Sequence, residues 1–121
     1  IDVKGGYPSD NTGLFEFTRR PEDMGRFKVP TLRNIELTSP YMHDGSIKTL
    51  EEVIDHYAAG GRTISSGEYE GKGSESPVKS SFVIGFDLKP GEKEDLIAFL
   101  KSLTDREFIT DPKYADPWEK R

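Results

Sequence analysis

Apolar residues recur at helical spacing in two parts of the chain. Spacings of three and four residues place side chains on one face of a helix, and the first such run consists of Leu50, Val53, Ile54 and Tyr57. Thr49 precedes this run and Glu52 follows three residues later, which is the pattern of a capping box. Gly60 and Gly61 then provide a C-terminal stop. The pattern predicts a helix over 50–59.

A second apolar stripe lies closer to the C-terminus. It consists of Leu96, Ile97, Leu100 and Leu103, with Phe99 on its flank. Pro90 suits the first position of a helix, where a backbone N–H is not needed. Lys101 suits the negative end of the helix dipole. This pattern predicts a helix from Pro90 to about Leu103.

Less regular structure is expected in the first third of the chain. Glycine, proline, aspartate and asparagine punctuate residues 1–26, which predicts an ordered loop in which residues 14–17 could be extended. A short helical turn is expected over 31–37, after a proline that favours helix starts. Ser39 and Pro40 end this turn, because a residue before proline is pushed out of the helical region.

The remaining segments are predicted to be loops. Residues 60–80 are rich in glycine and serine and have no periodicity, so a long loop is expected there. The tail from Asp105 onward is expected to be a surface extension. Since no strand-rich pattern and no repeat is visible, the predicted fold class is a small, loop-rich all-α domain.

Composition limits the size of the core and the class of partner. The 121 residues allow one domain or part of one. Only 33% of them are hydrophobic, so a cofactor, a metal or another chain is expected to help hold the fold together. A net charge of −5 without a block of basic residues argues against nucleic acid and anionic membranes as partners. No apolar run approaches the ~18 residues of a membrane span.

The inventory of reactive residues is small. The chain has no cysteine, which excludes disulfides, thiolate metal sites and covalent attachment of a c-type haem within it. His43 and His56 are not in a zinc-binding spacing. No phosphate-binding glycine loop and no serine-nucleophile motif is present. The residues alone therefore predict a small helical domain and leave its function open.

Three ordered segments resemble a known family. They are the runs Phe27–Ile35 and Pro40–Ser46 and the run Thr49–Tyr57, which Gly60-Gly61 closes. Together they resemble the second haem domain of bacterial di-haem cytochrome c peroxidases and MauG-type enzymes. Further on, Ser81-Phe82, Gly85-Phe86 and the run Asp95–Thr104 resemble the end of that domain. The resemblance extends over about 11–104 and is densest over 27–61.

The resemblance implies a cytochrome c-like fold and, in the intact enzyme, two c-type haems held through Cys-x-x-Cys-His motifs. It also implies hydrogen peroxide-driven oxidation of an external donor, usually in the periplasm. This sequence lacks that cysteine motif. We therefore expect a piece of a longer enzyme, incomplete at its N-terminal side, with a loop region 1–26, a core 27–104 and a tail 105–121. The chain starts at Ile1 rather than Met, which suggests processing or trimming. A split enzyme and a degenerate haem-free relative are the alternatives.

The resemblance assigns Tyr57 a role in iron binding. At this position the peroxidases commonly have a methionine ligand to the second haem, and MauG-like enzymes have a tyrosine. A phenolate ligand lowers the reduction potential relative to a thioether. From the pattern alone Tyr57 would instead be a core aromatic. Met42 is a second candidate ligand, though methionine more often fills a core, and His56 lies about 100° off the apolar stripe, facing solvent or a haem propionate.

Six other residues take roles from the resemblance. The backbone carbonyls of Thr38 and Pro40 would help to bind calcium between the two haem domains, since oxygen ligands suit that ion; an ordinary turn is the alternative. Arg33 and His43 would reach haem propionates or the region between the haems, or make structural hydrogen bonds. Tyr41 and Phe27 would pack in the haem pocket.

No catalytic acid or base can be assigned, because the family handles peroxide in its first domain. The expected function is therefore to form the pocket of the electron-relay haem in a di-haem peroxidase or oxidase. Its partners would be the N-terminal haem domain, hydrogen peroxide and a donor, either a redox protein or a protein tryptophan. A non-catalytic electron-transfer module and a haem-free binding domain are the rival hypotheses.

Overall fold

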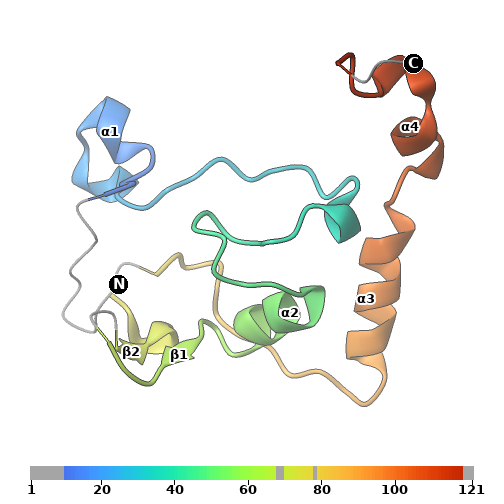
Figure 1. Ribbon diagram of the computed structural model, residues 1–121. Coiled ribbons are helices and arrows are strands. Elements are labelled where there is room, and N and C mark those ends of the chain that lie inside the picture. Colours follow the sequence, from blue (N-terminus) through green and yellow to red (C-terminus); the bar gives the residue numbers. More distant parts are fainter. Residues whose placement is uncertain (1–9, 68–69, 78, 119–121) are drawn as a thin grey trace.

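The computed structural model describes residues 10–67, 70–77 and 79–118 (Figure 1). Helices and short strands alternate with long irregular segments. In chain order the elements are α1 Phe15–Thr18, η1 Pro21–Asp23, η2 Ile35–Leu37, α2 Leu50–Ala58, β1 Thr63–Ile64, β2 Gly71–Lys72, η3 Gly73–Glu75, α3 Glu92–Ser102, α4 Arg106–Thr110 and η4 Pro112–Tyr114, where η marks a 3-10 helix.

Helix α2 confirms the first predicted helix and its caps. The Thr49 hydroxyl accepts a hydrogen bond from the Glu52 N–H at 3.2 Å, and the Glu52 carboxylate accepts one from the Thr49 N–H at 3.2 Å. Beyond the helix, Gly60 and Gly61 have positive φ angles of 69° and 124°. A Cβ on Gly61 would lie 2.7 Å from the carbonyl carbon of Gly73, so this turn requires glycine.

The core is small and lies where α2 packs on α3. Leu50 and Ile54 from α2 and Leu100 from α3 are its buried residues. The partly buried residues packed against this cluster are Ile35, Tyr41, Leu88, Leu96, Ile97 and Leu103. The apolar stripes that predicted the two helices are therefore the surfaces by which the helices meet.

Helix α3 starts two residues later than predicted. It spans Glu92–Ser102, and Gly91 occupies the N-cap with a φ of 90°. That left-handed residue separates Pro90 from the helix, so the proline does not take the first helical position. The Glu92 carboxylate accepts a hydrogen bond from the Lys89 N–H at 2.8 Å and holds the turn that leads into α3.

A two-stranded antiparallel sheet lies within the predicted 60–80 loop. Strand β1 pairs with β2 in a register that places Thr63 opposite Lys72 and Ile64 opposite Gly71. Each strand has two residues, which is too short for an alternating pattern to be visible in the sequence. The all-α prediction is therefore incomplete.

One prediction about the first third of the chain is wrong, and a second is confirmed only in part. Residues 15–18 form a helical turn, α1, rather than an extended stretch. The turn predicted over 31–37 is reduced to η2, because Asn34 has a positive φ of 61° and cannot continue a helix. The Asn34 N–H donates instead to the Leu103 carbonyl at 3.0 Å, which ties this segment to the end of α3.

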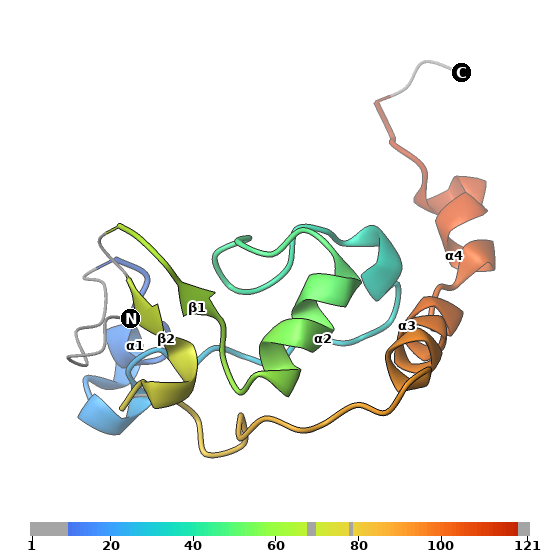
Figure 2. The same ribbon diagram turned by 90° about the horizontal axis from the view of Figure 1, so that it is seen from below.

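The predicted C-terminal extension contains two short helices, α4 and η4. Asp105 caps α4, because its carboxylate accepts a hydrogen bond from the Phe108 N–H at 2.9 Å. Figures 1 and 2 show that α4 continues beyond α3 and away from α2. Among the described residues, no helix has the length and apolarity needed to cross a membrane.

Candidate functional site

Tyr57 lies in the last turn of α2 and is 43% exposed. Leu50 and Ile54, on the same apolar stripe, are buried in the core. Tyr57 is therefore not part of the core formed by the described residues. Its ring meets the ring of His56 nearly at right angles, with centroids 5.2 Å apart and an interplanar angle of 81°.

His56 is half-buried and held by the chain that follows α2. Its Nδ1 accepts a hydrogen bond from the Arg62 backbone N–H at 3.2 Å. Burial lowers the pKa of His56, the Arg62 guanidinium lowers it further, and Asp44 opposes both. Because an Nδ1 that accepts a hydrogen bond carries no proton, the neutral ring with its proton on Nε2 fits this arrangement.

A cleft of about 370 Å³ opens beside His56, and its lining residues are Ser46, Ile47, Glu52, Asp55, His56, Ala59 and Arg62. Most of its charged groups have partners within the chain. Asp55 pairs with the Lys93 ammonium at 2.6 Å, and the Arg62 guanidinium donates to the Ser46 carbonyl at 3.4 Å. Within the described ranges, no group of three or more His, Cys, Asp or Glu side chains could hold a metal ion.

The loop 41–47 carries three of the predicted pocket residues, Tyr41, Met42 and His43. A β-bridge between Tyr41 and Ile47 closes it, with the Tyr41 N–H donating to the Ile47 carbonyl at 2.6 Å. The Tyr41 hydroxyl donates to the Ile35 carbonyl at 2.9 Å, and burial together with nearby carboxylates raises its pKa. Met42 is half-buried and has a left-handed backbone, with a φ of 70°.

His43 and Asp44 are the exposed residues in the middle of this loop. The His43 ring stacks on Phe27 with centroids 4.4 Å apart, which joins the loop to the segment before η2. The Asp44 carboxylate accepts a hydrogen bond from the Ser46 N–H at 3.1 Å. Partial burial raises the pKa of Asp44, but the hydrogen bonds from Ser46 and the proximity of His43 outweigh it and leave the pKa lowered.

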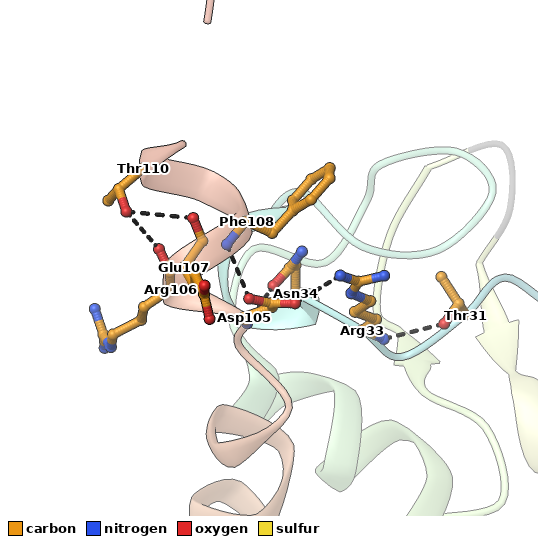
Figure 3. A network of polar contacts seen from close by, with 8 residues as sticks. All are labelled: Thr31, Arg33, Asn34, Asp105, Arg106, Glu107, Phe108 and Thr110. Atoms are coloured by element: carbon orange, nitrogen blue, oxygen red, sulfur yellow. Dashed lines mark hydrogen bonds and ion pairs between the residues drawn. The ribbon is translucent and has the colours of Figure 1, made fainter. Parts of the chain in front are cut away.

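Arg33 is engaged with the C-terminal segment (Figure 3). Its guanidinium forms an ion pair with Asp105 at 2.6 Å and lies over the Phe108 ring, 5.0 Å from the centroid. The Asp105 N–H donates to the Asn34 side-chain oxygen at 2.6 Å. The hydrogen bond from the Phe108 N–H, together with Arg33, lowers the pKa of Asp105. Arg33 and Asp105 are 72 residues apart, so the sequence carries no local signal of this pair.

Thr38 and Pro40 lie on the exposed turn between η2 and the 41–47 loop. The Thr38 hydroxyl donates to the Ile35 carbonyl at 3.2 Å, and the Ser39 hydroxyl donates to the Lys48 carbonyl at 2.8 Å. The first contact closes the turn on η2, and the second holds it against the start of α2. The structure thus brings His43 to Phe27 and His56 to Tyr57, whereas Arg33 joins a different part of the chain. The haem and calcium roles stay predictions.

Many large apolar side chains are exposed within the described residues. Phe82 is 94% exposed, and Val29 and Ile84 are almost as open. Leu32, Phe86 and Phe27 are also exposed. Phe86 lies near the end of α2, where its N–H donates to the Ala58 carbonyl at 3.0 Å. Exposed apolar residues in such number are typical of a surface that packs against something else.

No family model matches the chain, but curated proteins do. It is 39% identical over 92 residues to cytochrome-c peroxidase IdrP1 of Pseudomonas sp. (strain SCT), covering 76% of this chain and 21% of that protein. It is 39% identical over 77 residues to the methylamine utilization protein MauG of Methylorubrum extorquens, covering 64% of this chain and 18% of that protein. The chain thus spans about a fifth of the length of these curated relatives.

One solved structure is also similar. It is a crystal structure of a MauG-like protein associated with microbial copper homeostasis, with a TM-score of 0.89 and 55% identity. The match covers 98% of this chain and 36% of that chain. At this identity and coverage, the likeness supports a cytochrome c-like fold for the whole described chain, including the segment after α3.

Proposed function

This chain belongs to the family of di-haem cytochrome c peroxidases and MauG-like proteins, and we propose that it forms one side of the pocket of the second haem in an enzyme driven by hydrogen peroxide. The observation that carries this proposal is the position of Tyr57. Tyrosine binds haem iron in other proteins. Here Tyr57 lies at the end of a well-capped helix and is 43% exposed, in a chain with many exposed apolar side chains.

The residues present fit a haem bound in this way. A haem is a large, mostly apolar plate, and exposed apolar side chains such as Phe27, Phe86 and Phe82 are suited to cover it. The Tyr57 phenol is a suitable oxygen ligand. Because the chain has no cysteine, the covalent attachment must come from residues outside it. The haem would supply the electron-transfer chemistry, and this chain would hold, orient and shield it.

Each remaining residue has a proposed task in the pocket. Tyr41, whose hydroxyl is held by the Ile35 carbonyl, and the half-buried Met42 would pack beside the haem. His43, fixed on Phe27 by stacking, would reach a propionate. Arg33 would do so less readily, because Asp105 already engages its guanidinium.

We also propose a calcium ion at the turn before the 41–47 loop. Thr38 and Pro40 would contribute backbone carbonyl oxygens, which suit this hard cation. The other ligands would come from outside the described residues, in keeping with the lack of a carboxylate cluster within them. The proposed partners are the rest of the di-haem enzyme, hydrogen peroxide and a redox protein or protein tryptophan as donor. The proposed location is the periplasm.

The proposal is tested by Tyr57→Phe in the full-length, haem-loaded protein. Loss of the phenol oxygen removes the proposed ligand, so we expect the absorption and electron paramagnetic resonance spectra of the second haem to change. Tyr114→Phe is the matched control, because Tyr114 is an exposed tyrosine on η4. Unchanged spectra in Tyr57→Phe would show that this tyrosine does not bind the iron.

An assay of peroxide-driven donor oxidation separates the enzyme from a module that only relays electrons. The full-length protein, used as purified, is mixed with hydrogen peroxide and a reduced donor protein. Turnover supports the peroxidase proposal. Reversible reduction and oxidation without turnover would favour the relay, and a protein that contains no haem would favour a haem-free binding domain.

A further inference from the structure

The orientation of the Tyr57 ring is not determined by burial. The ring belongs to an exposed residue in the last turn of α2, where a tyrosine on its own could adopt more than one rotamer. Within the described residues, its ring makes a nearly perpendicular aromatic contact with His56. Edge-to-face contacts of this kind are preferred geometries for aromatic rings. The position of His56 therefore bears directly on the position of Tyr57.

His56 is itself held in place. Its Nδ1 accepts the Arg62 N–H at 3.2 Å, in a partly buried environment, from a residue six positions later. The Gly61 N–H donates to the His56 carbonyl at 2.9 Å. The first contact reaches the imidazole itself and comes from a backbone group rather than a flexible side chain, so it restricts rotation of the ring. The second contact fixes the backbone of His56 at the end of α2.

The glycine pair after α2 makes this arrangement possible. Gly60 and Gly61 take positive φ angles, which direct the chain back toward α2 and bring the Arg62 N–H to Nδ1 of the imidazole. A side chain at Gly61 would clash with the backbone of Gly73. This turn therefore does more than stop the helix, because it also fixes the residue next to the proposed ligand.

We propose that His56 is a positioning residue for Tyr57: held by the Arg62 N–H, its ring limits Tyr57 to one orientation. This inference rests on the proposed function, in which Tyr57 binds the haem iron, and goes beyond it by assigning the neighbour's role. Groups that orient a metal ligand commonly contribute about 10–100-fold to metal affinity or activity. His56 acts through Tyr57 and needs no contact with the haem.

The test compares two substitutions at His56 in the full-length, haem-loaded protein. In His56→Asn the side-chain oxygen can take the place of Nδ1 and accept the Arg62 N–H, but the ring is lost. In His56→Ala both the ring and the acceptor are lost. The first readout is resonance Raman spectroscopy of the iron-bound tyrosine, and the second is hydrogen exchange at the Arg62 amide.

We expect both variants to replace the single set of tyrosine bands with two sets or one broadened set. Exchange at the Arg62 amide should stay within about threefold of wild type in His56→Asn and rise at least about tenfold in His56→Ala, where the hydrogen bond is gone. Tyr114→Asn is the control, because it also replaces an aromatic ring by an amide, but on η4; it should leave both the bands and this amide unchanged.

Tyrosine bands unchanged in both His56 variants would overturn the inference while leaving the proposed function standing. Absence of tyrosine bands in the wild-type protein would instead overturn Tyr57 as a ligand, and the inference would fall with it. If His56→Asn does not load haem, His56→Gln removes the same ring and keeps an amide acceptor. Bands that remain single in that variant would equally overturn the inference.

Discussion

The two ends of the α2 apolar stripe are covered very differently. Leu50 and Ile54 are 4% and 3% exposed against α3, whereas Tyr57 is 43% exposed one turn later. Periodicity identifies which side chains share a face, but it does not say what covers them. A single stripe thus builds the core at its start and leaves a chemically useful side chain open at its end.

The two tyrosines near α2 differ in the same way. The Tyr41 hydroxyl donates to the Ile35 carbonyl, and burial raises its pKa. Tyr57 makes a ring contact with His56 and is 43% exposed. A half-buried phenol that donates to a carbonyl serves packing, and an exposed phenol remains available to a ligand. The contrast therefore distinguishes a structural tyrosine from a candidate iron ligand.

The largest expected effect comes from a substitution at the buried end of the α2 stripe. Ile54→Ala should destabilise α2 by about 2–5 kcal/mol, because it leaves a cavity against Leu100. The measurement is the free energy of opening of α2 from hydrogen exchange in the full-length protein. The matched control is Ile109→Ala, since Ile109 is exposed on α4; it should change α2 by less than about 0.5 kcal/mol. Equal effects from the two changes would refute the contrast.

The next effect concerns the glycine turn that follows the exposed end of the α2 stripe. Gly61→Ala should cost about 1–3 kcal/mol, because alanine is strained at a φ of 124° and its Cβ would lie 2.7 Å from the Gly73 backbone. Gly67→Ala is the control, because Gly67 also has a positive φ but has open space around it. Thermal unfolding of the two variants separates clash from backbone strain. A smaller loss in Gly61→Ala than in Gly67→Ala would contradict the packing described for this turn.

A smaller effect is expected at the start of α2. Thr49→Ala should cost about 1 kcal/mol, because it removes the hydroxyl that accepts the Glu52 N–H. Thr49→Ser keeps that hydroxyl and should recover most of the loss. Denaturant titration of both variants measures the difference. If serine and alanine behave alike, the capping box does not contribute to the stability of α2.

Long periodic elements were predictable from the sequence, and short or tertiary ones were not. Helices α2 and α3 carry stripes and caps that act within a few residues. The β1–β2 pair has two residues per strand, below the length at which a period can be seen. The left-handed Asn34 depends on contacts with Leu103 and Asp105. The cap on α4 did have a local signal, because aspartate is a favoured N-cap residue.

The candidate site was predictable only in part, for a related reason. The position of Tyr57 on a helix follows from its spacing, but its role as a ligand comes from the family resemblance. The hydrogen bond from the Arg62 N–H to His56 depends on the turn through Gly60 and Gly61. The sequence predicted that these glycines end the helix, but it did not predict the contact that the turn creates. The Arg33–Asp105 pair joins residues far apart in the chain, and a single sequence contains no signal for it.

The smallest expected effect concerns that ion pair. The pKa of Asp105 is lowered in the folded protein, by the Phe108 N–H first and then by Arg33. The ionised form therefore favours the folded state at pH values above the unfolded pKa of about 3.9. This contribution is lost as the pH falls through the lower folded pKa. Because the pair is exposed and open to screening by salt, its effect should be modest.

Asp105→Asn tests this directly, because asparagine can still cap α4 but does not titrate. The stability of the variant should depend less on pH below about 4 than that of the wild-type protein, and the difference should shrink in high salt. Lys72 and Glu75 form another exposed ion pair, away from this segment; Glu75→Gln is therefore the matched control and should not alter opening of α4. If Asp105→Asn leaves both the pH dependence of stability and hydrogen exchange in α4 unchanged, the ion pair with Arg33 does not hold the C-terminal segment in place.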